Sequence, residues 1–219
     1  MNGDKGNHRQ RASSTNSVQT EIHRAASRGD IQAIKTSIET GLDINSRDVA
    51  GRTPLMVASY ANQVEAFRTL LELGADVDLQ DDVQNNPFLY AGAEGLLEIL
   101  ALANQAGADP AITNRYGGVA IIPAAEKGHL HAVRYPLEHT SVDVNHVNSL
   151  GWTALLEAII LTDGGPIHQA IIRKLLAHGA DTSITDHEGL SPLDHAIARG
   201  YTEIVGLLEN KPSPFRCSS

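Results

Sequence analysis

The chain has 219 residues and a formal net charge of −9, and 42% of its residues are hydrophobic while only 4% are aromatic. A core in such a chain must consist of leucine, isoleucine, valine and alanine, and leucine and alanine favour helices because they lose little rotamer freedom there. The sequence contains no uncharged apolar run of about 18 residues, so we expect no membrane-spanning helix. Its one cysteine, Cys217, cannot form an internal disulfide, which favours the reducing cytoplasm.

Charge and polarity separate the two ends from the rest of the chain. Residues 1–20 and 211–219 each carry a formal charge of +2, so the segment between them carries −13. A segment this acidic repels phosphate backbones, and we expect no nucleic acid partner. Residues 1–17 and 211–219 contain few apolar side chains, which predicts a disordered N-terminal segment and a flexible tail.

Residues 18–210 contain an internal repeat. Segments similar to "GRTPLMVASYAN" follow one another at steps of 33, 33, 34 and 38 residues, beginning at Gly51, Gln84, Gly117, Gly151 and Gly189. An alanine stands at the same position of each segment, and Ala25 marks a further copy that lacks the head of the motif. The predicted repeats cover about 18–50, 51–83, 84–116, 117–150, 151–188 and 189–210.

Each repeat predicts two helices and a loop. In the second repeat Thr53 can cap a helix that begins with Pro54, and Asn62 ends it four residues after the marker alanine. A second helix with apolar residues at three-and-four spacing then leads to Gly-Ala-Asp and a loop. The first helices are predicted at 21–28, 54–61, 87–94, 120–127, 154–161 and 192–199, and Pro123 predicts an irregular helix in the fourth repeat.

The period of 33 residues and the head Thr53-Pro54-Leu55 resemble the ankyrin repeat, although Met56 replaces the histidine of that motif. The resemblance covers residues 18–210, and the segments "YGG…EKGH" and "GWTALLEAI…DGG" are similar to stand-alone bacterial ankyrin repeat proteins. It implies an all-α ankyrin repeat solenoid of about six helix-turn-helix repeats joined by hairpin-like loops. It also implies a monomeric module that binds a partner protein, without catalysis, cofactor or membrane attachment.

The partner-binding residues are expected in the loops and on the outer side of the first helices. The loop candidates are Arg47, Arg52, Arg115, Tyr116, Trp152 and His187. The helix candidates are Tyr60, Tyr90, Glu94, Glu126, Lys127 and Glu157.

Trp152 is the only tryptophan of the chain and stands at the loop position that Arg52 occupies in the second repeat. Tyr116 and Arg115 belong to the preceding loop, within reach of the same partner side chain. Tryptophan, tyrosine and arginine are enriched in binding hot spots, so we expect Trp152 to be displayed for binding. The alternative is that its ring covers the base of its own loop.

The sequence also bears on other possible sites and roles. Glu126, Lys127 and Glu157 could form an enzymatic or small-ligand site, but no nucleophile with an orienting partner accompanies them, so a solvated charged face is favoured. His129 and His131 lack the convergent ligands of a metal site. The extra residues before the last repeat predict a longer turn over Thr162–Gln169. An exported effector that binds a host protein has the same sequence features.

Overall fold

Pairs of short helices joined by protruding loops make up the computed structural model, which describes residues 21–210. Two compact units divide the chain between Pro87 and Phe88. The predictions for residues 1–17 and 211–219 lie outside the described residues. No strand occurs within residues 21–210, and the expected all-α fold is confirmed.

The first unit contains two helix pairs. Residues 21–28 are helical and are followed by α2 (Ile31–Glu39); the second pair is α3 (Pro54–Tyr60) and α4 (Val64–Glu72). In the second pair the Thr53 hydroxyl accepts a hydrogen bond from the Met56 backbone N–H at 3.2 Å. Pro54 occupies the first helical position, where its missing N–H costs no hydrogen bond.

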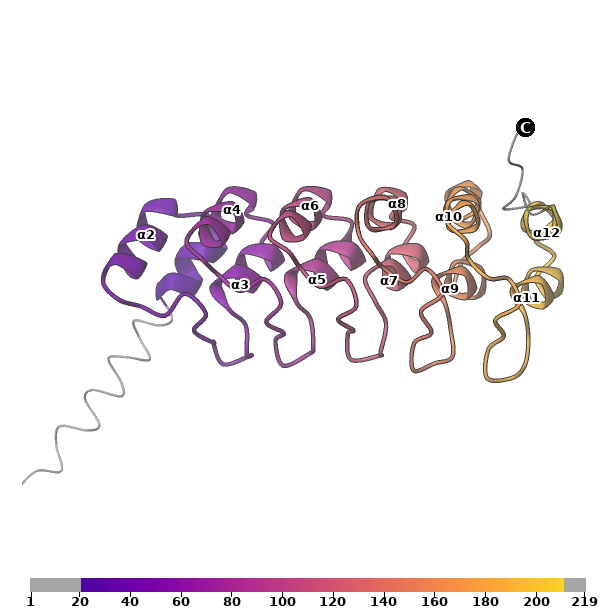
Figure 1. The fold of residues 1–219 in the computed structure, drawn as a ribbon, viewed down its shortest axis with the longest axis horizontal. Coiled ribbons are helices and arrows are strands. Elements are labelled where there is room, and N and C mark those ends of the chain that lie inside the picture. The colour runs from indigo at the N-terminus through magenta and orange to yellow at the C-terminus, as the bar shows by residue number, and fades with distance from the viewer. Residues whose placement is uncertain (1–20, 211–219) are drawn as a thin grey trace, which may run out of the picture. The chain divides into compact units, whose positions relative to one another are not determined.

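The second unit contains the remaining pairs. They are α5 (Pro87–Glu94) with α6 (Leu97–Gln105), α7 (Ile121–Glu126) with α8 (Leu130–His139), α9 (Ala154–Ile160) with α10 (Pro166–Ala177), and α11 (Pro192–Ala198) with α12 (Thr202–Glu209). Within this unit, Figure 1 shows the first helix of each pair in one layer and the second helix in the other. The loops project from the layer of first helices.

The alanine register predicted the first helices correctly: α3, α5, α7, α9 and α11 each match their predicted range to within one residue at either end. All six marker alanines have no exposed surface. Because protein interiors are close-packed, we expect a larger side chain at these positions to displace its neighbours. The marker alanines are Ala25, Ala58, Ala91, Ala124, Ala158 and Ala196.

The predicted irregularity at Pro123 is also present. Helix α7 has only 6 residues, and its N-cap, Ala120, makes no side-chain capping bond. The helices α9 and α11 instead begin with Thr153 and Ser191, whose hydroxyls accept hydrogen bonds from backbone N–H groups three residues on. The fourth repeat therefore lacks the hydroxyl cap of these two repeats.

The insertion in the fifth repeat differs from the prediction of a longer turn over Thr162–Gln169. Helix α10 begins at Pro166 and has 12 residues, against 9 in α4 and α6, so half of the predicted turn is helical. Proline at the first position fixes a helical φ at no cost in hydrogen bonds. The remaining loop is held by Tyr201, whose hydroxyl donates to the Thr162 carbonyl at 2.6 Å.

Candidate functional site

Each loop between helix pairs is held by one Asp or Asn side chain. In the loop before α9, the Asn148 Oδ1 accepts hydrogen bonds from the backbone N–H groups of Leu150 at 2.9 Å and Trp152 at 3.0 Å. The Asn148 backbone N–H in turn donates to the Trp152 carbonyl at 3.0 Å. The same three bonds recur in every described loop of this kind, so each loop tip is ordered by one side chain and by its own backbone. We call the Asp or Asn that accepts these bonds the bracketing residue of its loop; the five are Asp48, Asp81, Asn114, Asn148 and Asp186.

Adjacent loops of one unit are also bonded to each other. In the second unit the Ser149 N–H donates to the Tyr116 carbonyl at 2.9 Å, and the His146 Nε2 lies 2.7 Å from the Gly117 carbonyl oxygen. In the first unit the Asp82 N–H donates to the Ala50 carbonyl at 3.1 Å. The loops before α7 and α9, which carry Tyr116 and Trp152, are therefore neighbours, as predicted.

The loops display large apolar side chains. Tyr116 is 51% exposed, and Val147 and Leu150 in the neighbouring loop are 45% and 47% exposed. A folded loop that needed only to connect helices would not require apolar residues at its tip, and clustered exposed apolar side chains mark interaction sites. The other exposed apolar loop residues are Val49, Val83 and Leu190.

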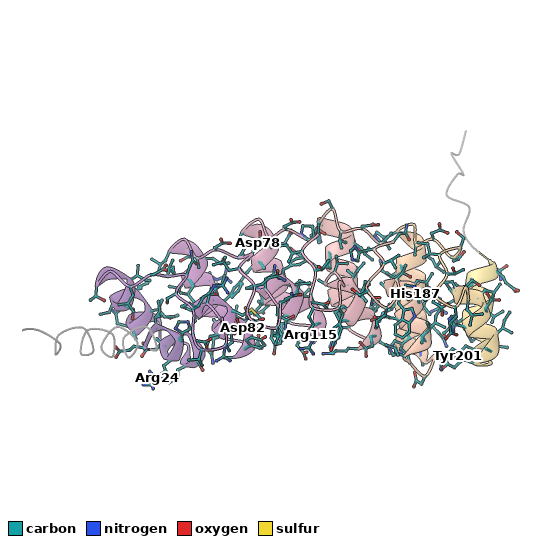
Figure 2. All side chains as sticks on the ribbon, turned by 90° about the horizontal axis from the view of Figure 1, so that it is seen from below. Arg24, Asp78, Asp82, Arg115, His187 and Tyr201 are labelled. Atoms are coloured by element: carbon teal, nitrogen blue, oxygen red, sulfur yellow. The ribbon has the colours of Figure 1, made fainter. Side chains whose placement is uncertain are left out.

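Trp152 lies between these exposed residues and the helices, and its side chain is half-buried. Arg115 lies over the Tyr116 ring, with its guanidinium carbon 4.8 Å from the ring centre, in cation–π geometry. Figure 2 labels the Arg115 side chain. The two arms of a candidate contact surface, Arg115 with Tyr116 and Leu150 with Trp152, thus come from two bonded loops.

Arg47 and Arg52, also predicted as partner-binding residues, have partners within the first unit. The Arg47 Nη1 donates to the Gln80 carbonyl at 2.6 Å and to the Gly51 carbonyl at 2.9 Å. The Arg52 guanidinium forms an ion pair with Asp48, 2.7 Å between Nη2 and Oδ2, and lies 6.0 Å from the centre of the Tyr60 ring. These contacts order the loop whatever else the two arginines bind.

Tyr60 extends this network to the next loop. Its hydroxyl donates to the Asp81 Oδ2 at 2.7 Å and accepts from the Asn85 Nδ2 at 3.3 Å. Asp81 is the bracketing residue of that loop and is buried. The predicted binding residue Tyr60 therefore also connects a first helix to the following loop.

Two predicted helix residues, Glu94 and Lys127, form an ion pair in the second unit, and a third, Tyr90, feels the charge of both. The Lys127 Nζ lies 2.6 Å from the Glu94 Oε1, and both side chains are about 40% exposed. Burial, together with the nearby Glu94 charge, raises the pKa of Tyr90. This part of the expected charged face is present on α5 and the end of α7.

Glu157 does not belong to that face, and its predicted place on a solvated surface is wrong. The residue is 6% exposed, and its Oε1 accepts a hydrogen bond from the Asn148 Nδ2 at 2.8 Å. Burial first, and then the Glu126 charge, raise the pKa of Glu157 to about 7, although the Asn148 bond acts in the opposite direction. The loop that Asn148 brackets covers the carboxyl group, which helical periodicity alone does not show.

In the last repeat, His195 and Asp186 stand at the positions that Glu157 and Asn148 occupy in the fifth repeat. The His195 Nε2 lies 2.7 Å from the Asp186 Oδ2, so an imidazole meets a loop carboxylate where Glu157 meets a loop amide. The Leu190 backbone N–H and, less strongly, the His195 bond hold the pKa of Asp186 below its ordinary value. The predicted residue His187 is exposed, and a Cβ atom added to Gly151 would lie 2.9 Å from its ring. The His187 ring therefore lies against Gly151 of the preceding loop.

The structure does not bring Glu126, Lys127 and Glu157 together as a reactive group, because Lys127 pairs with Glu94 and Glu157 is bound by Asn148. Within residues 21–210, no three His, Cys, Asp or Glu side chains gather so that they could hold a metal ion. Of the helices in the same residues, none has both the length and the apolar content of a membrane-spanning segment.

None of the Asp and Asn residues that hold the loops was among the predicted partner-binding residues. The signal was present, since these residues recur at the same steps of 33, 33, 34 and 38 as the heads of the repeats. Side chains of Asp and Asn that accept from backbone N–H groups two residues on form a turn by themselves.

Comparisons with known proteins agree with this geometry. The family model described as ankyrin repeats, in three copies, matches residues 4–81 and 88–186. The ankyrin repeat protein YahD of Escherichia coli K12 is 44% identical over 184 residues, which cover 84% of this chain and 92% of YahD.

Solved structures are similar over nearly the same length. The crystal structure of an ankyrin repeat domain from Acinetobacter baumannii AYE is 50% identical, with a TM-score of 0.83, over 86% of this chain and 95% of that one. Another ankyrin repeat protein of known crystal structure is 39% identical, with a TM-score of 0.84, over 89% of this chain and 98% of its own.

Proposed function

The chain belongs to the ankyrin repeat family, and we propose that it binds a partner protein through its loops, with Trp152 at the centre of the contact. Ankyrin repeats are generally protein–protein interaction modules, and the fold is a non-enzymatic scaffold. We define the loop face as the surface of the two bonded loops before α7 and α9, with Arg115, Tyr116, Val147, Leu150 and Trp152.

The observation that carries the proposal is the exposure of apolar side chains on loops that are themselves ordered. Tyr116, Val147 and Leu150 are each about half exposed, while the backbone beneath them is fixed by Asn148 and by the bond from Ser149 to Tyr116. Ordered loops lose little conformational entropy on binding, so more of the contact energy remains as affinity. Trp152, Tyr116 and the Arg115 that lies over the Tyr116 ring are of the residue types that hot spots favour.

Catalysis is not part of this proposal. The raised pKa of Glu157 would suit a general acid, but the side chain is 6% exposed and its oxygen is bound by Asn148. Glu157 is better understood as a structural group that fixes the loop of Trp152. With one cysteine in the chain, we place the protein and its partner in the cytoplasm.

The experiment is a comparative capture from native lysate with the full chain, the variant Trp152→Ala and the control Leu97→Ala. Leu97 is 38% exposed at the start of α6 in the same unit, away from the loops. A protein captured by the wild type and the control, and lost with Trp152→Ala, identifies the partner of the loop face. For that protein we expect the Trp152 variant to bind about 30-fold more weakly, as at a hot spot of about 2 kcal/mol. Equal capture by all three proteins would contradict the proposal.

A further inference from the structure

A pocket of about 680 Å³ lies in the first unit. The described residues that line it come from the helix at 21–28, from α3 and from the loop between α2 and α3. Its volume is in the range of clefts that receive ligands or the side chains of a partner. Figure 2 shows Arg24, at one edge of this pocket, extending away from the ribbon.

The pocket concentrates positive charge in an acidic unit. Residues 21–87 contain six Lys and Arg residues and eleven Asp and Glu residues. Four of the six cations line the pocket: Arg24, Arg28, Arg47 and Arg52. Of the eleven carboxylates, one lines it, that of Asp48. The lining of this pocket is therefore basic, although the unit as a whole is acidic.

Within the part of the chain that the structure describes, one of these four arginines is neutralised by an ion pair. Arg52 pairs with Asp48 at 2.7 Å. Arg47 is bound by two carbonyl oxygens, which hold its guanidinium in place but leave its charge uncompensated. Arg24 and Arg28 are exposed, stand four residues apart on one helix, and form no ion pair with any of residues 21–210. The described residues that line the pocket therefore carry a net formal charge of +3.

Apolar surface lies beside these charges. The same pocket is lined by Val57 and Tyr60 of α3 and by Ala61, the C-cap of that helix. Val49, in the loop between α2 and α3, also lines it and is fully exposed. Arginines next to an apolar wall match an extended peptide in which carboxylates flank an apolar side chain, because guanidinium groups bind carboxylates through paired hydrogen bonds.

We infer that this basic pocket binds an acidic segment of a partner protein, with Arg24 and Arg28 pairing with its carboxylates and an apolar side chain of the segment placed against Tyr60. The ends of this chain are poor occupants, because residues 1–20 and 211–219 each carry a formal charge of +2. The inference rests on the proposed function, to which it adds a second contact and the charge of the partner.

The test uses the full chain and a fluorescein-labelled peptide of alternating glutamate and leucine, with the matching glutamine and leucine peptide as the neutral probe. The pocket variant is Arg24→Gln with Arg28→Gln. The control is Lys35→Gln with Arg68→Gln, which removes two exposed cations from α2 and α4 that do not line the pocket. By fluorescence anisotropy at low salt we expect the pocket variant to bind the acidic peptide about 10-fold more weakly than the control, since each exposed pair contributes up to about 1 kcal/mol.

Four outcomes would overturn the inference. The glutamate and glutamine peptides bind equally; the pocket variant binds like the control; inorganic phosphate at peptide-like concentration displaces the peptide, which would make this a small-anion site; or the pocket variant alone changes the sedimentation coefficient, which would make a second copy the occupant. Trp152→Ala separates the two proposals. If it abolishes capture of the partner while the pocket variant captures normally, the proposed function stands and the pocket assignment fails.

Discussion

Replacing Glu157 with glutamine should make the second unit more stable at neutral and alkaline pH and leave its stability nearly unchanged in acid. Glutamine has the same shape and keeps the oxygen that accepts from the Asn148 Nδ2. It removes the charge that burial and Glu126 disfavour. The substitution therefore isolates the cost of ionising one buried carboxyl group.

The magnitude follows from the pKa of Glu157, which folding raises from 4.5 to about 7. Between these values the folded state retains a proton that the unfolded state has released, so the free energy of unfolding falls as the pH rises. At 1.36 kcal/mol for each pKa unit, the wild type loses about 3 kcal/mol across this window relative to Glu157→Gln. Because the side chain is 6% exposed, solvent screening reduces this figure little.

The assay is urea unfolding from about pH 4 to about pH 8.5, followed by the fluorescence of Trp152, which lies five residues from Glu157 in the same unit. Glu98→Gln, at an exposed position of α6, shows what the loss of one carboxylate does by itself. Glu126→Gln should lower the pKa of Glu157 and so reduce the loss of stability in the wild-type background. A difference between wild type and Glu157→Gln that stays constant with pH would refute the reasoning.

Three other substitutions test the packing and the loops. Ala91→Leu should lower the free energy of unfolding by about 1–3 kcal/mol through overpacking, because Ala91 has no exposed surface, and an unchanged urea midpoint would show spare room there. Gln84→Gly should raise it by up to about 1 kcal/mol, since Gln84 has φ of 60° where the other loops have glycine, and a lower melting temperature would contradict this. Asn148→Ala should lower it by about 2 kcal/mol or more, because two backbone N–H groups and Glu157 lose their partner; urea unfolding at constant pH measures the effect.

The helices could be predicted from the sequence because the marker alanines respond to a constraint that is the same in every repeat. A position where helices approach closely accepts only a small side chain, so its period remains readable when the surrounding residues vary. Ala124 keeps the register even in α7, where Pro123 and the missing hydroxyl cap shorten the helix to 6 residues. The start of α10 was also readable, from Pro166 after a glycine, but the length of the insertion suggested a longer turn.

The candidate site was harder to predict, because its residues are defined by contacts between a loop and the following helix. Glu157 stands nine residues after Asn148, and only the folded loop places the amide against the carboxyl group. Arg24 and Arg28 were not among the predicted binding residues, because the first repeat lacks the head motif from which the other repeats were aligned. Their proximity to Arg47 depends on the path of the loop around them, which the repeat spacing does not specify.

The most direct test of the loop face is the fluorescence emission of Trp152 in the free protein and with the captured partner present. The partner is used as a domain without tryptophan, or with tryptophan analogues whose emission is distinct from that of Trp152. Our account predicts that acrylamide quenches the free protein, and that the partner shifts the emission to the blue and protects it from quenching. The same titration with Tyr116→Ala should require a higher partner concentration. Unchanged emission and quenching at a saturating concentration of bound partner would contradict the central claim, because Trp152 would then lie outside the contact.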